Sequence, residues 1–300
     1  LGQYQNLRKY ETVKMWHDEH NIPIHISCQV LKVARSGYYK WLKADKTSRV
    51  SNNEKIAELI KHIHEQHPDM GYRRIRDNLY RDYDIDINDK RVLRICRKMK
   101  IKSTIKYSRH SCTVNAANPQ HIAENILNRE FYADKPNEKW LTDVTEFKYY
   151  EGITVHKIYL SAVLDLFDRR IVAYEIGRSN NNALVYANFN KAIEDNPDAH
   201  PIFHSDRGFQ YTNCTFHNML ARTGMTQSMS RVAHCIDNGP MEGFWGILKR
   251  ECYYSRKFTS EASLITTIEN YIRYYNTERY QRQLGILTPM EKHCLYFEVA

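Results

Sequence analysis

Near the start of the chain, apolar side chains recur at the spacing of an α-helix. Residues 10–19 predict one helix, and the apolar positions of residues 22–31 predict a second. Residues 32–35 break the pattern, and Ser36 is placed to cap a third helix over residues 36–43. Two short helices across a tight turn are the helix-turn-helix pattern, in which the second helix can lie in the major groove of DNA.

A second helical segment follows, with a clearer apolar stripe. Its first helix has caps available at residues 52–53 and ends at Pro68, and Gly71 opens the next helix. A third helix, capped at residues 88–89, buries its apolar positions and presents basic ones. The basic positions are Arg91, Arg94, Arg97 and Lys98. This segment is a second helix-turn-helix-like unit in series.

Beyond residue 127 the pattern changes from helical spacing to runs rich in β-branched and aromatic residues. Three such runs of strand length are joined as hairpins, and short helices and strands then alternate. The expected strands are 139–150, 156–167, 169–177, 201–204 and 226–230, and the expected helices are 183–195, 215–223, 240–252 and 261–275. This order predicts an α/β layer with a mixed sheet, preceded by all-α helix-turn-helix segments.

Composition narrows the class of protein. The chain has 300 residues, of which 42% are apolar, so it can bury a sizeable core. No apolar run approaches the length of a membrane span, and the polar, basic start carries no signal peptide, which predicts no membrane association. Seven scattered cysteines without a C-x-x-C pair suit a reducing cytosol. Leu1 stands where a start Met is expected, so we expect a trimmed or fused chain.

Charge is divided unevenly along the chain. Residues 1–120 carry 24 Lys and Arg against 13 Asp and Glu, whereas residues 121–300 carry 20 against 22. Residues 91–109 contain eight basic residues and no acid. A stretch of this kind neutralises phosphates, and its binding to DNA depends on salt. The uneven division predicts a polyanion-binding part joined to a near-neutral body.

Three carboxylates lie at positions that point to a function, and one of them is inside a strand, where burying an unpaired charge is costly. Asp143 is inside the first strand, Asp206 follows the short strand ending in His204, and Glu242 is in the first turn of a helix. If the two strands are parallel neighbours, the aspartates lie side by side. Clustered carboxylates take up protons unless divalent cations lie between them, and hard oxygen ligands suit Mg²⁺ or Mn²⁺. Two such ions can assist an in-line phosphoryl displacement.

The helix over residues 240–252 supports this interpretation. Glu242, Gly246 and Lys249 share one face, on which Gly246 would leave room for a substrate backbone and Lys249 would bind a phosphate. Phe244 and Leu248 are spaced to pack into the core.

The spacing of the carboxylates is specific. Sixty-two residues separate Asp143 from Asp206, thirty-five separate Asp206 from Glu242, and Lys249 follows seven residues later. This resembles the D-D-35-E signature of retroviral integrases and related transposases. WLTDVTEF, HSDRGFQY, SMSRVAHCIDNGPMEGFWGILKRE and YNTERYQRQLGILTP together resemble the second-frame (OrfB) transposase half of the IS-three family of bacterial insertion sequences. VLKVARSGYYKWLK and GYRRIRDNLY resemble that family's helix-turn-helix segments.

The resemblance implies an RNase H-like catalytic core with Asp143, Asp206 and Glu242 as ligands of two Mg²⁺ or Mn²⁺ ions. It implies cleavage of the element's ends and strand transfer by the 3′-OH. The implied partners are double-stranded DNA, as terminal inverted repeats and as target, an upstream helix-turn-helix (OrfA-type) half as fusion or partner, and a second copy or more of this chain. The sequence departs from the family's commoner DNA-x-x-E-S-F at Gly239, Gly243 and Trp245.

The basic and aromatic residues expected to contact DNA lie in both helical segments and after the glutamate. They are Arg35, Tyr38, Lys40, Arg73, Arg74, Arg91, Arg94, Arg97, Lys98, Lys249 and Arg250. The expected divisions are helix-turn-helix residues 1–50, a basic helical segment 51–105, a linker 106–127 and a catalytic core 128–300. Two alternatives stay open at this point: a nuclease of the same fold that does not join DNA, and a DNA-binding regulator without catalysis.

Several other polar residues have simpler interpretations. Asp165 and Asp168 lie at a strand end and a turn, and we expect both to be structural. His204 is expected to be a satisfied strand-end histidine. Asp237 and Asn238 stand where they would cap the helix that carries Glu242.

Overall fold

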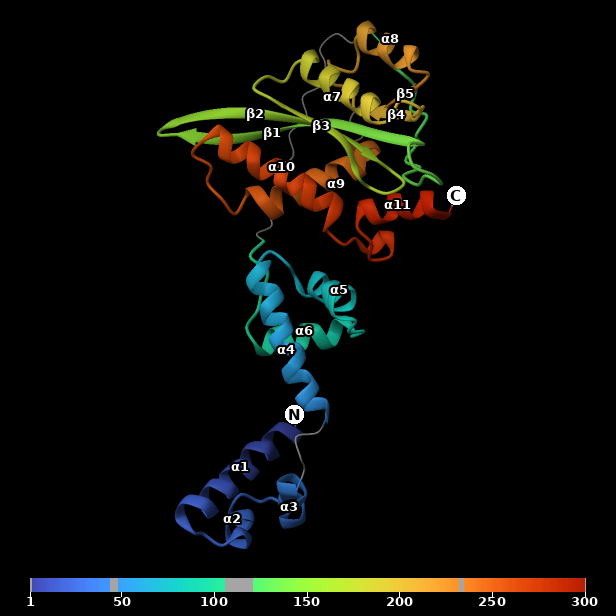
Figure 1. Cartoon of the computed structure of the whole chain (residues 1–300). Coiled ribbons are helices and arrows are strands. Elements are labelled where there is room, and N and C mark those ends of the chain that lie inside the picture. The colour runs from blue at the N-terminus through green and yellow to red at the C-terminus, as the bar shows by residue number, and fades with distance from the viewer. Residues whose placement is uncertain (1, 44–47, 106–120, 232–234, 300) are drawn as a thin grey trace. The chain divides into compact units, whose positions relative to one another are not determined.

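The computed structural model describes residues 2–43, 48–105, 121–231 and 235–299 (Figure 1). They form two compact units, one up to His62 and one from Ile63 onward. Residues 106–120, most of the expected linker, and Leu1 lie outside the described residues.

The N-terminal unit is helical, as its sequence predicts. Its helices are α1 (Gly2–His20), α2 (Ile24–Val30), α3 (Arg35–Lys43) and most of α4 (Ser48–Gln66). Val13, Cys28 and Tyr38 form the core between the first three helices. Helix α4 begins at Ser48, ahead of the caps expected at residues 52–53.

The second unit opens with two basic helices, α5 (Tyr72–Tyr83) and α6 (Asp89–Lys98). Helix α5 ends where Asp84 adopts a left-handed conformation (φ 51°). Asn88 caps α6, because its side-chain oxygen accepts a hydrogen bond from the Lys90 N–H at 2.7 Å. The cap expected at residues 88–89 is therefore confirmed.

A five-stranded mixed sheet follows. Its strands are β1 (Lys139–Glu151), β2 (Thr154–Asp165), β3 (Ile171–Gly177), β4 (Ile202–Ser205) and β5 (Thr226–Met229). They are ordered β3-β2-β1-β4-β5, with β2 antiparallel to its neighbours and β1, β4 and β5 parallel. Gly152 (φ +62°) turns the β1–β2 hairpin in a conformation that side chains disfavour. The predicted mixed α/β sheet is confirmed.

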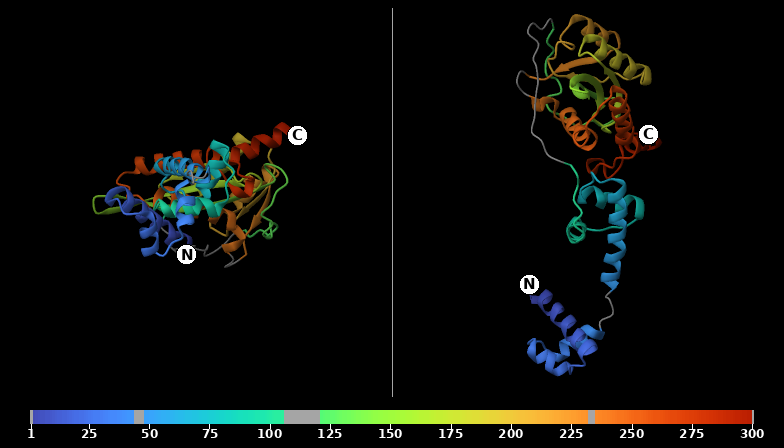
Figure 2. Two further views of the ribbon diagram at one scale, coloured as in Figure 1. Left: turned by 90° about the horizontal axis from the view of Figure 1, so that it is seen from below. Right: turned by 90° about the vertical axis from the view of Figure 1, so that its left-hand side faces the viewer.

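Helices cover both faces of the sheet (Figures 1 and 2). On one face lie α7 (Asn182–Asp195) and α8 (Cys214–Arg222), and on the other lie α9 (Gly239–Leu248) and α10 (Glu261–Thr277). Strand alternation divides β1 between the two cores, so that Trp140 packs with the first layer and Leu141 with the second. Helix α11 (Pro289–Val299) and three short helical turns complete the chain: η1 (Cys235–Asn238), η2 (Lys249–Tyr253) and η3 (Arg282–Leu284).

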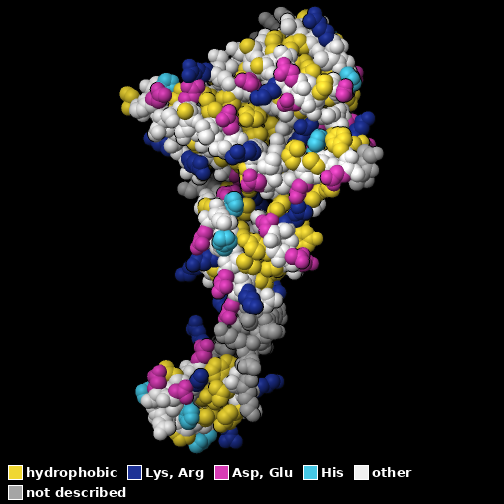
Figure 3. Space-filling model, viewed as in Figure 1, with side chains coloured by type: hydrophobic (Ala, Val, Ile, Leu, Met, Phe, Trp, Pro, Cys, Tyr) yellow, Lys and Arg dark blue, Asp and Glu magenta, His cyan; other side chains and the backbone are white. Residues whose placement is uncertain are grey.

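The surface of the α/β part carries charges of both signs. On the face drawn in Figure 3, Lys and Arg are interspersed with Asp and Glu there, as the near balance of charge in residues 121–300 leads one to expect. Among the helices that the structure describes, none combines the length and the apolar character needed to cross a membrane.

Candidate active site

Two of the three carboxylates are brought together by the parallel pairing of β1 and β4. Leu141 pairs with His204 in this ladder, and Asp143 and Asp206 each follow two residues later. They therefore stand at equivalent positions of neighbouring strands, on the same side as each other. The expectation that the two strands are parallel neighbours is confirmed.

Neutral N–H groups donate to both aspartates. The Asp143 Oδ1 accepts a hydrogen bond from the Val144 backbone N–H at 2.8 Å, and its Oδ2 accepts one from the Trp245 indole N–H at 3.0 Å. The Asp206 Oδ1 accepts from the Gly208 N–H at 2.8 Å.

The three carboxylates influence one another electrostatically. Desolvation, followed by the charge of Asp206, raises the pKa of Asp143 to about 7. Burial raises the pKa of Asp206, and burial together with the charge of Asp206 raises the pKa of Glu242. A site of this kind disfavours its own negative charge, so a bound cation would stabilise it.

Helix α9 presents Glu242 from its outer side. Met241, Phe244 and Leu248 are buried against the sheet, and burial of an apolar side chain of this size stabilises the fold by about 1.5–3 kcal/mol. The expected packing of Phe244 and Leu248 is confirmed. Glu242 itself is exposed. Across the described ranges, no three His, Cys, Asp or Glu side chains are grouped closely enough to hold a metal ion. The three carboxylates are near enough for their charges to act on one another, but they do not form a closed group of metal ligands.

The start of α9 is fixed to the sheet and not by side-chain caps. Asn238 is the N-cap residue, but its side chain makes no capping hydrogen bond. Its Nδ2 instead donates to the Thr142 carbonyl of β1 at 3.1 Å. The expectation that Asp237 and Asn238 cap the helix is wrong, because both side chains have partners outside it.

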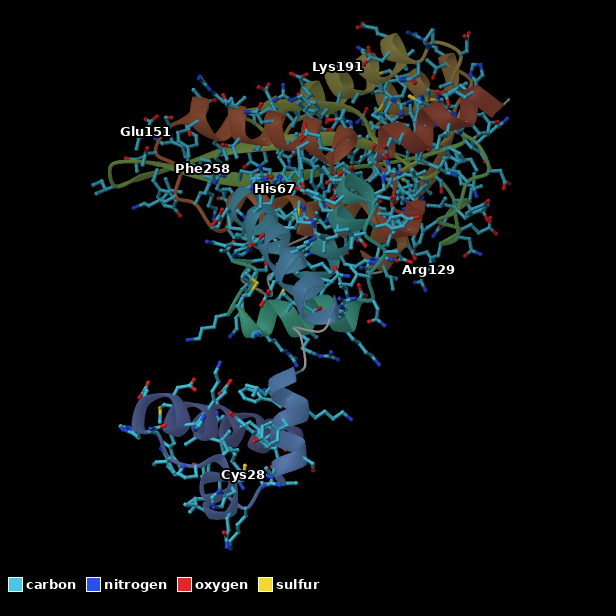
Figure 4. The ribbon with its side chains drawn as sticks, turned by 60° about the horizontal axis from the view of Figure 1, so that its bottom comes forward. Cys28, His67, Arg129, Glu151, Lys191 and Phe258 are labelled. Atoms are coloured by element: carbon cyan, nitrogen blue, oxygen red, sulfur yellow. The ribbon has the colours of Figure 1, made fainter. Side chains whose placement is uncertain are left out.

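Asp237 is buried completely and is bound by two arginines. Its carboxylate accepts hydrogen bonds from Arg231 at 2.9 Å and from Arg129 at 2.6 Å, as well as from the Asn125 amide at 3.0 Å. The hydrogen bond from Arg231 is the main reason why the pKa of Asp237 lies far below its usual range. Arg129, labelled in Figure 4, comes from the segment before β1 and so ties that segment to the entry of α9.

The basic residues after Glu242 lie close to the sheet. The Lys249 Nζ is 5.1 Å from the centre of the Phe147 ring of β1. The Arg250 guanidinium lies 3.3 Å from the point where a side chain on Gly246 would begin. The space that Gly246 was expected to leave for a substrate backbone is therefore occupied by Arg250.

Two residues expected to contact DNA make contacts within the protein instead. Tyr38 is 1% exposed and packs among Tyr10 and Trp41, with ring centroids 6.2 and 5.8 Å away. Arg74 belongs to α5, and its guanidinium lies 2.8 Å from Asp69 and 3.0 Å from Glu251. Both expectations are wrong, since a Tyr–Arg pattern gives helix positions but not which face is buried.

The other expected DNA contacts differ in exposure. Arg91 is half-buried, as are Lys249 and Arg250. The exposed ones are Arg35, Lys40, Arg73, Arg94, Arg97 and Lys98. The outer face of α6 thus presents three of its four expected contacts to solvent.

The structural interpretations of the remaining polar residues are confirmed. Asp165 accepts backbone N–H bonds from Asn137 at 2.7 Å and Phe167 at 2.8 Å, and Asp168 accepts one from Arg170 at 2.9 Å. His204 is buried between Ser228 and Ser230 hydroxyls at 2.9 and 3.1 Å. Burial lowers the pKa of His204 to about 4, so it is neutral at physiological pH.

Sequence reasoning missed a second cluster of charged groups, next to the first. Glu251, in η2, is 6% exposed at its side chain and pairs with Arg279 at 2.8 Å as well as with Arg74. The Tyr271 hydroxyl also donates to it, at 2.9 Å. His67, just past α4, stacks on Tyr274 beside this cluster (Figure 4). The one signal in the sequence is the clustering of tyrosines in residues 271–275, which by itself predicts only helix packing.

Comparison with known proteins gives three matches to family models. Residues 133–235 and 242–293 each match a model described as an integrase core domain, and residues 51–109 match a model described as an HTH-like domain. The two integrase-core matches contain Asp143, Asp206 and Glu242.

Curated relatives extend over most of the chain. The putative transposase InsK for insertion sequence element IS150 of Escherichia coli (strain K12) is 36% identical over 274 residues, covering 90% of this chain and 93% of the relative. The transposase InsF for insertion sequence IS3A of the same organism is 30% identical over 274 residues, covering 89% and 92%. Among solved structures, the HTLV-2 integrase catalytic core domain in complex with magnesium is 18% identical, with a TM-score of 0.40 over 53% of this chain and 98% of that one. Assignment to a family therefore rests on the sequence relatives.

Proposed function

This chain belongs to the IS3 family of insertion-sequence transposases, which carry an integrase core domain, and on that premise we propose that Asp143, Asp206 and Glu242 are its catalytic residues. It is a DNA transposase, an enzyme of the polynucleotidyl transferase type. The observation that supports the proposed centre most is the position of Asp143 and Asp206, each two residues beyond the paired Leu141 and His204 of neighbouring parallel strands, where both accept hydrogen bonds from neutral N–H groups.

We propose Mg²⁺ or Mn²⁺ as the cofactor, with two ions at each site. The donor set fits, because carboxylate oxygens are the ligands that these hard cations prefer and because the raised pKa of Asp143 reflects a need for positive charge. Asp143 and Asp206 would share one ion, and Glu242 would complete the second site. When bound, the ions supply positive charge that stabilises the attacking and leaving oxygens at phosphorus.

The chain's own residues would act by positioning. Lys249 and Arg250 would bind phosphates of the DNA end next to the carboxylates, so that the scissile bond is held in line. Hydrolysis of that bond at the element's end would leave a 3′-OH. The 3′-OH would then attack a phosphate of the target DNA, forming one P–O bond and breaking another, with no covalent intermediate on the enzyme.

Recognition of the element would lie in the helical segments. We propose that exposed Arg94, Arg97 and Lys98 of α6, with Arg73 of α5 and half-buried Arg91, bind the terminal inverted repeat. Arg35 and Lys40 of α3 would contribute a second set of phosphate contacts. The division into segments 1–50, 51–105, 106–127 and 128–300 is part of this proposal.

The assembly that acts on DNA is also proposed. Two element ends must meet in one reaction, so a dimer or larger assembly of this chain on DNA is expected. An upstream OrfA-type helix-turn-helix half, as a fusion or a separate partner, would complete recognition.

The experiment uses the full chain with labelled duplexes that carry the element's terminal inverted repeats, identified in the DNA that flanks the gene. With Mn²⁺ present, Asp143→Asn and Asp206→Asn should each lower both cleavage and joined product by at least about 10³-fold, since the two aspartates act as a unit. Glu242→Gln should do the same. Glu146→Gln, in the same strand but paired with Lys157 at 2.9 Å, is the matched control and should retain activity.

Three outcomes would contradict this proposal. Unchanged activity in Asp206→Asn would remove the assigned chemistry. Cleavage without joined product would indicate a nuclease. Tight DNA binding without either activity in the unaltered chain would indicate a regulator.

A further inference from the structure

The indole of Trp245 is directed at a proposed catalytic carboxylate. Trp245 lies three residues after Glu242 on α9, is 7% exposed, and packs against Phe244 with ring centroids 5.0 Å apart. Its Nε1–H donates to the Asp143 Oδ2 at 3.0 Å. An indole N–H can only donate, and a buried one needs an acceptor. Here that acceptor is a carboxylate of the proposed metal site.

The hydrogen bond fixes the orientation of Asp143 without neutralising it. One oxygen accepts from the Val144 N–H and the other from Trp245, so the plane of the carboxylate is held at both ends. A carboxylate has about four lone-pair positions, and two remain for a cation. A Lys or Arg at the same place would cancel the charge that a cation needs, whereas a neutral donor leaves it intact.

The same bond holds the helix that carries Glu242. Asn238 ties the start of α9 to the Thr142 carbonyl at 3.1 Å, and Trp245 ties the middle of α9 to Asp143, the next residue of β1. Glu242 lies between these two anchors. Its backbone is therefore fixed relative to the strand that supplies Asp143, while its side chain remains exposed.

We propose that Trp245 is a positioning residue for metal binding: its indole N–H orients the Asp143 carboxylate and holds α9, and so Glu242, against β1. This inference rests on the proposed function, because it assumes that Asp143 is a metal ligand. Trp245 does not touch the substrate, and its effect reaches the reaction through Asp143. Groups that orient metal ligands in this way typically change metal affinity about 10–100-fold when they are removed.

The test compares two buried tryptophans on opposite faces of the sheet. Trp245→Phe keeps the ring and removes the N–H. Trp140→Phe makes the same chemical change in a fully buried tryptophan of β1, whose Nε1 donates to Asn137 at 3.2 Å in the opposite layer. Mn²⁺ is titrated into each full chain and binding is followed by calorimetry. Trp245→Phe should weaken Mn²⁺ binding at least about 10-fold, and Trp140→Phe should leave it within about threefold of the unaltered chain, well inside that effect.

A second measurement separates orientation from general damage. The Mn²⁺ concentration that gives half-maximal cleavage should rise in Trp245→Phe by the same factor as the dissociation constant, and saturating Mn²⁺ should restore most of the rate. The chain has four tryptophans. Mn²⁺ at Asp143 should quench the fluorescence of Trp245, so most of the quenching should vanish in Trp245→Phe and persist in Trp140→Phe.

The outcomes distinguish this inference from the proposed function. If Asp143→Asn abolishes Mn²⁺ binding but Trp245→Phe leaves it unchanged, the role of Trp245 is wrong and the catalytic site stands. If both tryptophan variants weaken binding equally, the effect is one of core packing and the inference is again wrong. If the unaltered chain binds no Mn²⁺, both proposals are wrong.

Discussion

Two groups of carboxylates, one before and one after helix α9 in the chain, have partners of different charge. Asp143 and Asp206 accept hydrogen bonds from neutral N–H groups, and the pKa of each is raised. Glu251, just beyond the helix, is paired with Arg74 and Arg279. Burial alone would raise the pKa of Glu251, but the two arginines outweigh it and lower that pKa. A carboxylate that the protein neutralises itself serves the fold, whereas one left uncompensated is suited to a ligand of positive charge.

The largest expected effect is the loss of stability when Glu251 is replaced. Glu251→Gln would leave the largely buried guanidinium of Arg279 with a neutral partner and would remove one of the two acids paired with Arg74, so the free energy of unfolding should fall by about 3–5 kcal/mol. Urea denaturation of the full chain measures this. Asp206→Asn should instead leave stability unchanged or raise it, because it removes repulsion from Asp143. Glu261→Gln, which breaks an ion pair with the exposed Arg178, is the control and should cost less than about 1 kcal/mol. Equal losses in Glu251→Gln and Asp206→Asn would break the comparison.

Replacing Asp237 should also lower the free energy of unfolding, but by less than replacing Glu251. Asp237→Asn should lower the free energy of unfolding by roughly 1.5–3 kcal/mol, since it weakens charge-assisted hydrogen bonds from Arg231 and Arg129. The folded-state pKa of Asp237 is lowered, so its contribution is present above the ordinary Asp pKa near 4 and is lost as the pH falls below that value. The stability difference between the unaltered chain and the variant should therefore shrink between pH 5 and pH 2. A difference that does not change with pH would show that the charge of Asp237 is not what matters.

Asp143 should show the opposite pH dependence. Its folded-state pKa of about 7 lies above the ordinary value near 4, so its contribution to stability is present below pH 4 and is lost as the pH rises to about 7. Without divalent ions, the full chain should lose on the order of 1–3 kcal/mol more stability over this range than Asp143→Asn does. Thermal unfolding at a series of pH values measures the difference. Added Mn²⁺ should restore stability at pH 7 in the unaltered chain alone, and restoration in Asp143→Asn as well would place the ion elsewhere.

The smallest expected effect concerns the exposed basic residues of α6. Arg97→Ala and Lys98→Ala remove exposed charges of α6, so each should weaken binding of the terminal repeat a few-fold and reduce the slope of log K against log salt by about one. Fluorescence anisotropy at several salt concentrations measures both quantities. Lys191→Ala, on α7, is the matched control. Unchanged salt slopes in the α6 variants would remove that helix from the DNA-binding surface.

Much of the site could be predicted because its signals are local. A charge inside an apolar strand is costly, so Asp143 stood out. The order of hairpins and short strands predicts a mixed sheet in which β1 and β4 could be parallel neighbours, and the structure pairs them in this way. The spacing from Asp206 to Glu242 and Lys249 placed the third carboxylate on a helix, and the apolar positions Phe244 and Leu248 indicated which side of that helix is buried.

The parts that could not be predicted depend on partners distant in the sequence. The pattern around Arg74 marks a basic helix, but not that Glu251 and Tyr274 lie against it. Trp245 stands out in the sequence only as a departure from the family's commoner motif, because nothing local shows that its N–H reaches Asp143. Tyr38 was assigned to DNA because its helix is basic, although the adjoining helices bury that one position.

The ion pairs of η3 have a practical consequence for anyone who shortens the gene. Arg282 donates to Asp77 of α5 and to Asp89 of α6, each at 2.8 Å. A recombinant fragment that started at residue 128 would lack Asp77 and Asp89, the partners of Arg282, and Arg74, a partner of Glu251. Such a fragment should express poorly or precipitate, whereas one that started near residue 63 would retain every one of these pairs.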